Sequence, residues 1–172
     1  MGEIIFISGG ARSGKSRLAV KLAKDSAGKI AFLATCDPGD SEMKKRVVLH
    51  KKARPKSWTT FEEPEEPAVL LKKIGSKFEV IIIDCLTLLV ANLIQKGHRE
   101  KAIKNKINRM LNIAGKINAA VIFVSNEVGL GIVPVNKLAR NFRDLAGWIN
   151  QMVAEKAGRV FFVVSGIPWR LK

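Results

Sequence analysis

Short apolar runs alternate with longer amphipathic segments from one end of the chain to the other. The apolar runs predict strands, because they are rich in β-branched residues; they cover residues 3–8, 29–35, 80–83, 119–125 and 159–165, and the segment 57–61 is also β-prone. Helical patterns cover residues 15–24, 41–52, 96–116 and 136–155, and a short helix is predicted from Pro67. Strands that are apolar on both faces, with helices between them, predict a mostly parallel sheet with helices on both faces. We therefore expect a single α/β domain that includes residues 1–172.

The composition favours a packed globular protein. Of the 172 residues, 47% are apolar, which is enough for a full hydrophobic core. No apolar run has the length of a membrane span, and no secretion signal is apparent, so we expect a cytoplasmic protein without a membrane partner. Cys36 and Cys85 are the only cysteines, and two cysteines make neither a disulfide framework nor a metal site.

The charge is strongly positive and unevenly spread. The formal net charge is +15, and residues 87–172 carry 14 Lys and Arg against 4 Asp and Glu. Much of the excess lies in residues 96–116, which we interpret as a surface helix with a solvated lysine face. Such a charge favours anionic partners in general. Aromatic residues, on which bases of a single strand stack, make up only 6%, and tyrosine is absent, so we expect no nucleic-acid partner. Because of the positive charge, a nucleic-acid-stimulated RecA-like ATPase is kept as an alternative.

A phosphate-binding loop follows the first predicted strand. It matches the pattern G-x-x-x-x-G-K-[ST] in full and precedes a predicted helix, as this motif requires. The loop consists of Gly9, Gly10, Ala11, Arg12, Ser13, Gly14, Lys15 and Ser16. Its glycines allow backbone N–H groups to surround phosphate oxygens, and the following helix points its positive end at them. We expect Lys15 to neutralise the β- and γ-phosphates of a nucleotide and Ser16 to offer its hydroxyl to Mg²⁺.

Asp84 is the candidate for a second Mg²⁺ ligand. It follows the apolar residues 80–83, which places it at the carboxyl edge of the sheet, where open α/β folds bind ligands. The alternative is a helix N-cap, because an aspartate in this position can also cap the helix that follows.

His50 is the candidate nucleophile. It lies three residues after Val47 on the predicted helix 41–52, a spacing that turns both residues toward the apolar face. The surrounding lysines and arginines favour the neutral imidazole, which is the nucleophilic form, and they can also bind phosphate. From this pattern alone, a structural histidine is the alternative. His98 lies in the lysine-rich segment and is expected at the surface.

Several longer motifs occur in a fixed order along the chain. They are G-G-A-R-S-G-K-S at 9–16, F-L-A-T at 32–35, E-M-K-K-R-V-V-L-H at 42–50, R-P-K-S-W-T-T-F-E-E-P at 54–64, D-C-L-T-L at 84–88, S-N-E-V-G-L-G-I-V-P at 125–134 and L-A-R-N-F-R-D-L-A-G at 138–147. With this ordered set, the sequence resembles the bifunctional adenosylcobinamide kinase/adenosylcobinamide-phosphate guanylyltransferase family of cobalamin biosynthesis. A P-loop alone fits many functions, whereas the ordered set is specific.

The resemblance implies a P-loop NTPase-type (RecA-like) fold and two reactions at one site. A nucleoside triphosphate, ATP or GTP, first phosphorylates adenosylcobinamide with the help of Mg²⁺. A histidine then takes GMP from GTP, and the new phosphate accepts this GMP to give adenosylcobinamide-GDP. The family's R-[IV]-x-x-H motif matches Arg46 to His50, so the resemblance makes His50 the covalent histidine. It also implies a homotrimer.

The resemblance assigns further nucleotide contacts outside the P-loop. They fall on Ala34, Thr35 and Cys36 at a strand end, on Lys51, Lys52, Ala53 and Arg54 after the histidine, and on Glu62 and Asp84. Within this set, Arg54 can neutralise phosphate charge, and Glu62 can accept hydrogen bonds from guanine.

Some positions remain open to more than one interpretation. Asn126 and Glu127 are either strand-end groups that face the active site or parts of a turn that its glycines permit. Val135 stands where the family usually has a glutamate, and Lys51 stands where an arginine is frequent. If His50 is structural, the chain is instead a monofunctional P-loop small-molecule kinase.

Overall fold

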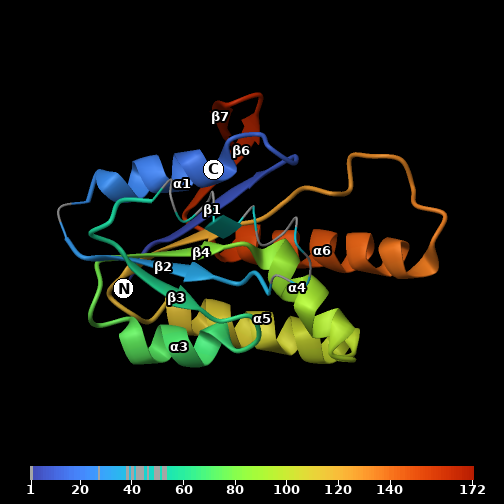
Figure 1. Ribbon diagram of the computed structural model, residues 1–172, viewed down its shortest axis with the longest axis horizontal. Helices are drawn as coiled ribbons and strands as arrows, with labels where there is room; N and C mark the ends of the chain where they lie inside the picture. Colours follow the sequence, from blue (N-terminus) through green and yellow to red (C-terminus); the bar gives the residue numbers. More distant parts are fainter. Residues whose placement is uncertain are drawn as a thin grey trace.

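Seven strands form one sheet at the centre of the protein (Figure 1). The computed structural model describes residues 2–26, 28–37, 39, 41, 45, 47–48, 51 and 54–172. The strands are β1 (Ile4–Gly9), β2 (Ile30–Ala34), β3 (Thr59–Glu62), β4 (Val80–Asp84), β5 (Ala120–Val124), β6 (Arg159–Val164) and β7 (Ile167–Arg170). Their order across the sheet is β3-β2-β4-β5-β1-β6-β7, and every neighbouring pair is parallel except β6 and β7. The predicted mostly parallel sheet is confirmed.

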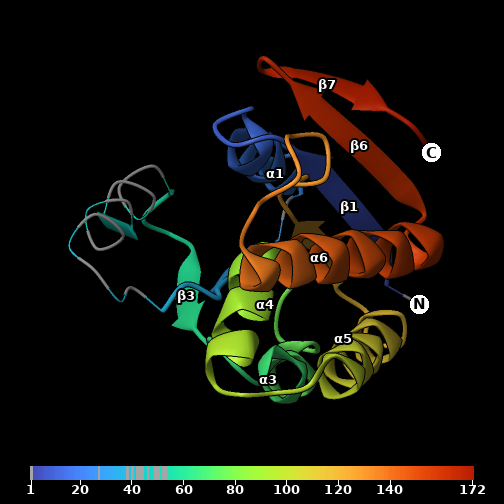
Figure 2. The same cartoon turned by 90° about the vertical axis from the view of Figure 1, so that its right-hand side faces the viewer.

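Helices cover both faces of this sheet. They are α1 (Lys15–Lys24), α3 (Pro67–Ile74), α4 (Leu86–Gln95), α5 (Glu100–Ala114) and α6 (Lys137–Lys156). Figures 1 and 2 show α1 on one face, and α3, α4, α5 and α6 on the other. Alternate residues of β1 serve the two layers, since Ile4 and Phe6 pack in the larger core, whereas Ile5 and Ile7 pack in the core that contains Ala19 of α1. The prediction of helices on both faces is therefore also confirmed.

The lysine-rich segment forms α5, as predicted. Its apolar residues at helical spacing are buried, and they are Ile103, Ile107, Met110, Leu111 and Ala114. Lysines on the other face are partly paired: Lys104 lies 2.5 Å from Glu100, and Lys106 pairs with Glu66. None of the helices in the described part of the chain combines the length and the apolar character needed to cross a bilayer.

The hairpin at the C-terminal side was not predicted as such. The run 159–165 predicts one strand, but β6 ends at Val164 and the chain turns back as β7, which pairs antiparallel with β6. Ser165 and Gly166 form the turn, with φ of 50° and 84°. Two central residues with positive φ make the kind of turn that matches the twist of a β-hairpin. The sequence signal was weak, because only Gly166 favours this conformation.

The predicted helix 41–52 is described only in part. Ser41, Lys45, Val47, Val48 and Lys51 are helical. No range was predicted for α4, and the remaining described elements agree with their predicted ranges to within a few residues. Asn136 caps α6 by accepting hydrogen bonds from the N–H groups of Leu138 and Ala139.

Candidate functional site

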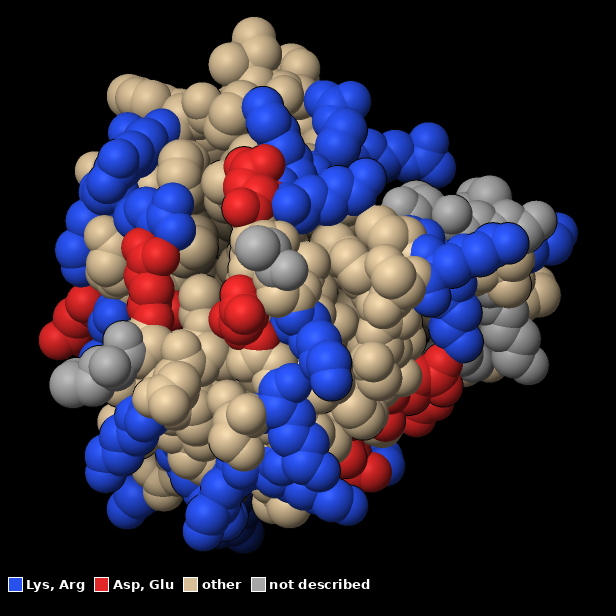
Figure 3. All heavy atoms as spheres, turned by 90° about the vertical axis from the view of Figure 1, so that its left-hand side faces the viewer, with Lys and Arg blue, Asp and Glu red and all other residues tan. Residues whose placement is uncertain are grey.

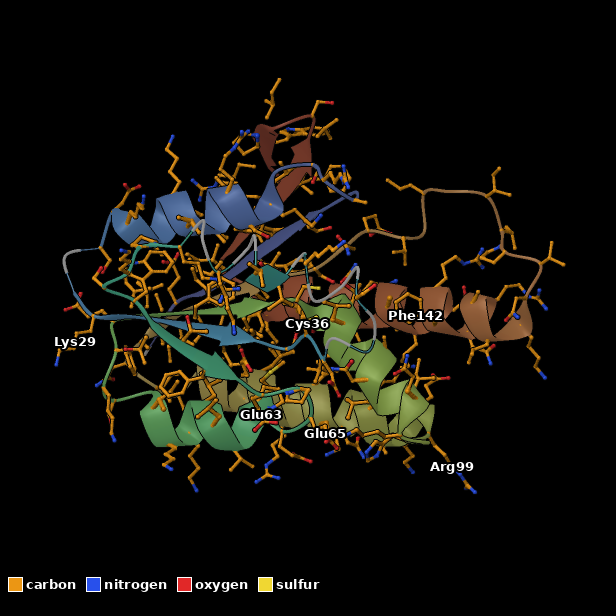
Figure 4. The ribbon with its side chains drawn as sticks, viewed as in Figure 1. Lys29, Cys36, Glu63, Glu65, Arg99 and Phe142 are labelled. Atoms are coloured by element: carbon orange, nitrogen blue, oxygen red, sulfur yellow. The ribbon has the colours of Figure 1, made fainter. Side chains whose placement is uncertain are left out.

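Neighbouring strands bring distant polar residues into one row at the carboxyl edge of the sheet. Ala34 of β2 lies beside Glu62 of β3 and beside Asp84 of β4, and Asp84 in turn lies beside Val124 of β5. Because β1 pairs with β5, the P-loop that follows β1 opens at the same edge. In Figure 4, Cys36 lies at this end of the sheet and Lys29 lies at the opposite end. Predicted nucleotide contacts from separate segments of the chain therefore converge.

The P-loop has the backbone conformation that its glycines were expected to allow. Gly9 has φ of 153° and Gly14 has φ of 103°. A Cβ atom on Gly9 would lie 2.4 Å from the carbonyl oxygen of Val163, so a side chain at this position does not fit. Arg12 also has a positive φ, of 56°. The loop then leads into α1, whose N-cap is Gly14.

Lys15 is a buried cation held by uncharged oxygens of its own loop. The side chain is 7% exposed, and its Nζ donates to the carbonyl oxygen of Gly10 at 2.5 Å and to Ser13 Oγ at 3.5 Å. Burial lowers the pKa of Lys15, and the negative charge of Asp84 acts in the opposite direction. A buried ammonium without a bonded anion is a binding group for one, and phosphate is the anion for which this loop is shaped.

Ser16 and Asp84 lie together as a metal site requires. Ser16 Oγ donates to Asp84 Oδ2 at 2.7 Å, which joins the start of α1 to the end of β4. Neighbouring oxygen ligands around Mg²⁺ lie about 3 Å apart, so these two oxygens fit adjacent positions of its octahedral shell. Asp84 is not a helix cap: the N-cap of α4 is Cys85, and it makes no side-chain capping bond. Among the described residues, no group of three or more His, Cys, Asp or Glu is arranged to hold a metal by itself.

Arg54 brings a second cation to this edge. The carbon at the centre of its guanidinium lies 3.4 Å from the ring centroid of Phe32, and its Nη1 atom is buried without a hydrogen-bond partner in the described part of the chain. Burial lowers the pKa of Arg54, whereas the charges of Asp84 and Glu62 act in the opposite direction. The guanidinium is therefore stacked, oriented and close to both carboxylates, and one of its N–H groups is left to bind a ligand.

Glu62 is paired with a lysine. Its Oε1 lies 2.5 Å from Nζ of Lys51, and both side chains are exposed, at 60% and 48%. Lys51 and Arg54, which follow the predicted histidine in the sequence, thus lie near the edge that carries Glu62 and Asp84. His50, Lys52 and Ala53 lie outside the described residues.

The end of β2 is held by buried hydrogen bonds. Thr35 is fully buried, its Oγ1 donates to the carbonyl oxygen of Cys85 at 2.7 Å and its N–H donates to the carbonyl oxygen of Asp84 at 3.2 Å, so in this structure it has no exposed atom for a nucleotide. Asn92 of α4 donates through Nδ2 to the carbonyl oxygens of Thr35 at 2.7 Å and Pro64 at 3.1 Å. This positioning role was missed from the sequence, although a polar residue on the buried side of an apolar helix was the available signal. Burial raises the pKa of the Cys85 thiol to about 11.

The end of β5 reaches the P-loop directly. The backbone N–H of Glu127 donates to the carbonyl oxygen of Gly9 at 2.9 Å. The Glu127 carboxylate accepts from the N–H of Gly129 at 2.8 Å, and Asn150 of α6 lies 3.4 Å from its other oxygen. The backbone of Glu127 therefore lies against the P-loop, and its side chain contacts the turn at Gly129; that it faces a bound substrate stays a prediction.

The connection from β5 to α6 stands away from the body of the protein (Figure 1). Its apolar side chains are exposed, with Ile132 and Val135 both at 97%. Arg140 Nη1 donates to the carbonyl oxygens of Pro134 and Val135. Because the anchor is made to backbone oxygens, it does not depend on which side chain occupies position 135.

A hollow of about 950 Å³ lies at the opposite edge of the sheet. Lys29, Lys77, Glu79 and Arg159 are among the residues that line it, and Figure 3 shows this face with basic side chains spread around it. Among the described residues that line the hollow, none belongs to the P-loop. Although the hollow has a large volume, the groups suited to bind phosphate and Mg²⁺ lie at the carboxyl edge of the sheet. The candidate nucleotide site is therefore the P-loop edge.

Known proteins match this chain over nearly its full length. The family described as cobinamide kinase / cobinamide phosphate guanyltransferase matches residues 5–171. A Pseudomonas aeruginosa protein named bifunctional adenosylcobalamin biosynthesis protein CobP is 41% identical over 167 residues, which are 97% of this chain and 96% of that protein. The Escherichia coli and Salmonella typhimurium proteins named bifunctional adenosylcobalamin biosynthesis protein CobU are each 38% identical over 181 aligned residues, covering 98% of this chain and 99% of theirs.

Two solved structures with a similar fold are ATPases. A prototypical ATPase from the type III secretion system of pathogenic bacteria has a TM-score of 0.57 at 14% identity, and the match covers 94% of this chain and 52% of that one. The assembled ATPase EscN of enteropathogenic E. coli has a TM-score of 0.65 at 13% identity, with 95% and 43% covered. The chain thus spans about half of these proteins or less, and at such identities the likeness concerns the fold alone.

Proposed function

Because the chain belongs to the cobinamide kinase / cobinamide phosphate guanyltransferase family, and is therefore a transferase, we propose that its P-loop edge carries out both reactions named by the family. In the first, ATP or GTP gives its γ-phosphate to a hydroxyl of adenosylcobinamide. In the second, GMP from GTP is transferred to that phosphate to give adenosylcobinamide-GDP. The observation that carries this proposal is the grouping of Lys15, Ser16 and Asp84 where β1 and β4 end.

The phosphorylation step relies on charge and position. Lys15 exchanges the loop oxygens that hold its ammonium for oxygens of the β- and γ-phosphates, and the backbone of the P-loop holds the same phosphates. Mg²⁺, when bound by Ser16 and Asp84, offsets negative charge on the nucleotide. The γ-phosphorus then forms its bond to the acceptor oxygen as its bond to the nucleoside diphosphate breaks.

The guanylyl transfer relies on His50. The neutral imidazole attacks the α-phosphorus of GTP, a phosphorus–nitrogen bond forms, and pyrophosphate leaves with the electrons of the broken bond. An oxygen of the cobinamide phosphate attacks the same phosphorus, and the imidazole leaves. Lys51 and Arg54 support this assignment, since their contacts with Glu62 and Phe32 hold the segment next to the histidine at the P-loop edge. Arg54 is the group that binds phosphate there, and Glu62 accepts N–H groups of guanine when it releases Lys51.

A homotrimer completes the proposal, on the basis of the family resemblance. β7 supports self-association, because an edge strand that exposes Ile167 at 70% and Trp169 at 65% is suited to contact with another chain. Sedimentation or light scattering of the purified protein tests the number of subunits.

Labelling with GTP tests the covalent step. The protein should acquire label from GTP that carries ³²P in the α-phosphate, and none from GTP labelled in the γ-phosphate. The bond should be acid-labile and alkali-stable, as expected for a phosphoramidate. His50→Ala should lose the label and the guanylyl transfer but keep phosphorylation, whereas His98→Ala should keep both.

The alternatives give different outcomes. A monofunctional P-loop kinase would phosphorylate its acceptor without ever carrying α-label, and persistent labelling of the His50→Ala protein would rule out His50 as the carrier. A nucleic-acid-stimulated ATPase would hydrolyse ATP faster in the presence of DNA or RNA, at salt concentrations that suppress nonspecific binding.

A further inference from the structure

Phosphorylation of a hydroxyl leaves one proton that must be removed from the attacking oxygen, and the residues already given a role in the proposed reactions are unsuited to take it. Lys15 is a cation, Ser16 and Asp84 are assigned to Mg²⁺, and Glu62 is paired with Lys51. From the position and contacts of Glu127, we propose that its carboxylate is the general base of the phosphorylation step. This inference rests on the proposed function, because it concerns the first of the two reactions.

The position of Glu127 is set by the sheet. β5 lies between β1 and β4, so the chain that leaves β5 emerges between the P-loop and Asp84. The N–H of Glu127 donates to the carbonyl oxygen of Gly9, and the next carbonyl along the chain, that of Gly10, holds the Lys15 ammonium. Glu127 is therefore hydrogen-bonded to the same short piece of backbone that holds Lys15, the cation proposed to bind the γ-phosphate.

The Glu127 carboxylate is oriented without being neutralised. One oxygen accepts from the N–H of Gly129 at 2.8 Å, and the other lies 3.4 Å from Nδ2 of Asn150. No ion pair of Glu127 occurs within the described ranges. A carboxylate has about four acceptor positions, so these two contacts leave lone pairs for a substrate hydroxyl.

Asn150 is an unusual residue to find beneath a surface turn. It is 7% exposed on the inner side of α6, near the apolar Ile149 and Val153. Its Nδ2 also donates to the carbonyl oxygen of Asn126 at 3.2 Å, while its Oδ1 is buried without a partner in the described part of the molecule. A buried amide with an unpartnered oxygen is costly, which indicates that it is retained for the groups that it orients at the end of β5.

The acceptor hydroxyl donates a hydrogen bond to Glu127, and its oxygen forms the new bond to the γ-phosphorus. The bond between that phosphorus and the bridging oxygen breaks, and the nucleoside diphosphate leaves with the electron pair. The hydroxyl proton moves to the Glu127 carboxylate and then to solvent, which the half-buried side chain can reach.

Two substitutions separate this role from a structural one. Glu127→Gln keeps the size of the side chain and an oxygen for the N–H of Gly129, but it cannot take a proton. Glu127→Asp keeps the carboxylate and withdraws it by about 1.5 Å, the length of one carbon–carbon bond. A general base predicts that Gln is the more damaging change, whereas a turn anchor predicts that Asp is. Glu155→Gln on the exposed end of α6 removes the same charge elsewhere and is the matched control.

The experiment measures each reaction by itself. Transfer of ³²P from γ-labelled ATP to cobinamide reports phosphorylation, and transfer from α-labelled GTP to preformed cobinamide phosphate reports the second step. Glu127→Gln should lower kcat for phosphorylation by about 10² to 10⁴-fold, with the KM for ATP changed less than about threefold. Guanylyl transfer and the melting temperature should match those of wild type and Glu155→Gln. Glu127→Asp should retain at least about ten times the phosphorylation rate of Glu127→Gln.

Three results would overturn the inference. They are phosphorylation by Glu127→Gln within about threefold of wild type, an equal loss of both reactions, and a Glu127→Asp protein that is slower than Glu127→Gln. If the wild-type protein phosphorylates cobinamide, each of these results overturns only the role of Glu127 and leaves the proposed function standing. A wild-type protein that does not phosphorylate cobinamide overturns the proposed function, and this inference with it.

Discussion

Asn92 gives the most direct test of how the candidate site is supported. Its Nδ2 ties the carbonyl oxygen of Thr35 after β2 to that of Pro64 after β3, and the side chain is 7% exposed. Asn92→Leu keeps a similar volume but leaves two buried carbonyl oxygens without this donor. Each such oxygen costs about 1–3 kcal/mol, and added apolar burial offsets part of this, so we expect a loss of about 2–4 kcal/mol in the free energy of unfolding.

Thermal and urea denaturation measure this loss. For a chain of 172 residues, 1 kcal/mol moves Tm by about 2–4 °C, so the expected fall is about 5–15 °C. The matched control is Asn105→Leu, because Asn105 is exposed on α5, where a surface substitution changes stability by less than about 0.5 kcal/mol. The KM for nucleotide should also rise in Asn92→Leu, since both strand ends lose their tie. Equal Tm values for the two variants would refute the reasoning.

Three further substitutions or treatments test individual groups. Lys15→Met should lower phosphorylation by at least about 10²-fold while leaving Tm nearly unchanged, because the buried ammonium is replaced by an apolar chain of similar length; near-normal turnover would contradict the P-loop role. Asp84→Asn should raise the Mg²⁺ concentration needed for half-maximal phosphorylation, and an unchanged magnesium titration would exclude Asp84 as a ligand. In the native protein at pH 8, Cys85 should resist alkylation, since a thiol with a pKa of about 11 is ionised in only about one molecule in 10³; mass spectrometry of the labelled peptides checks this, and rapid modification would show that the burial is wrong.

Most of the fold was predictable because its signals are local. Buried parallel strands are continuous apolar runs, so β1, β4 and β5 appear in the sequence within a residue or two of their observed bounds. The inner face of α5 was also predictable, since five apolar residues recur at helical spacing. β7 was not, because four exposed residues that pair with a single neighbour leave no periodic pattern, and its position depends on the turn at Ser165 and Gly166.

The sequence yields candidate site residues but not their contacts. The P-loop motif and the end of β4 made Ser16 and Asp84 candidates, yet their 2.7 Å contact depends on the order of strands in the sheet. Asp84 illustrates the difference, because local sequence allowed both a cap and a metal ligand, and only the geometry of α4 removes the cap. The role of Asn92 likewise needs two loops that lie 28 and 57 residues away along the chain.

Two cations near Asp84, the buried Lys15 and the partly buried Arg54, would make this edge suited to phosphate in both proposed reactions. Lys15 and Arg54 approach Asp84 from different segments, and burial lowers the pKa of both. Neither forms a direct ion pair in the described part of the chain. The free-energy cost of removing each cation from water is therefore not offset by a bonded carboxylate. In the proposed function, the phosphates of a bound nucleotide would offset that cost at both cations. Because Arg54 belongs to the segment that follows His50, and Lys15 belongs to the P-loop, the same nucleotide phosphates can couple the position of the histidine segment to the kinase loop. If the proposed function holds, a shared anion gives a physical reason for one site to serve two transfers.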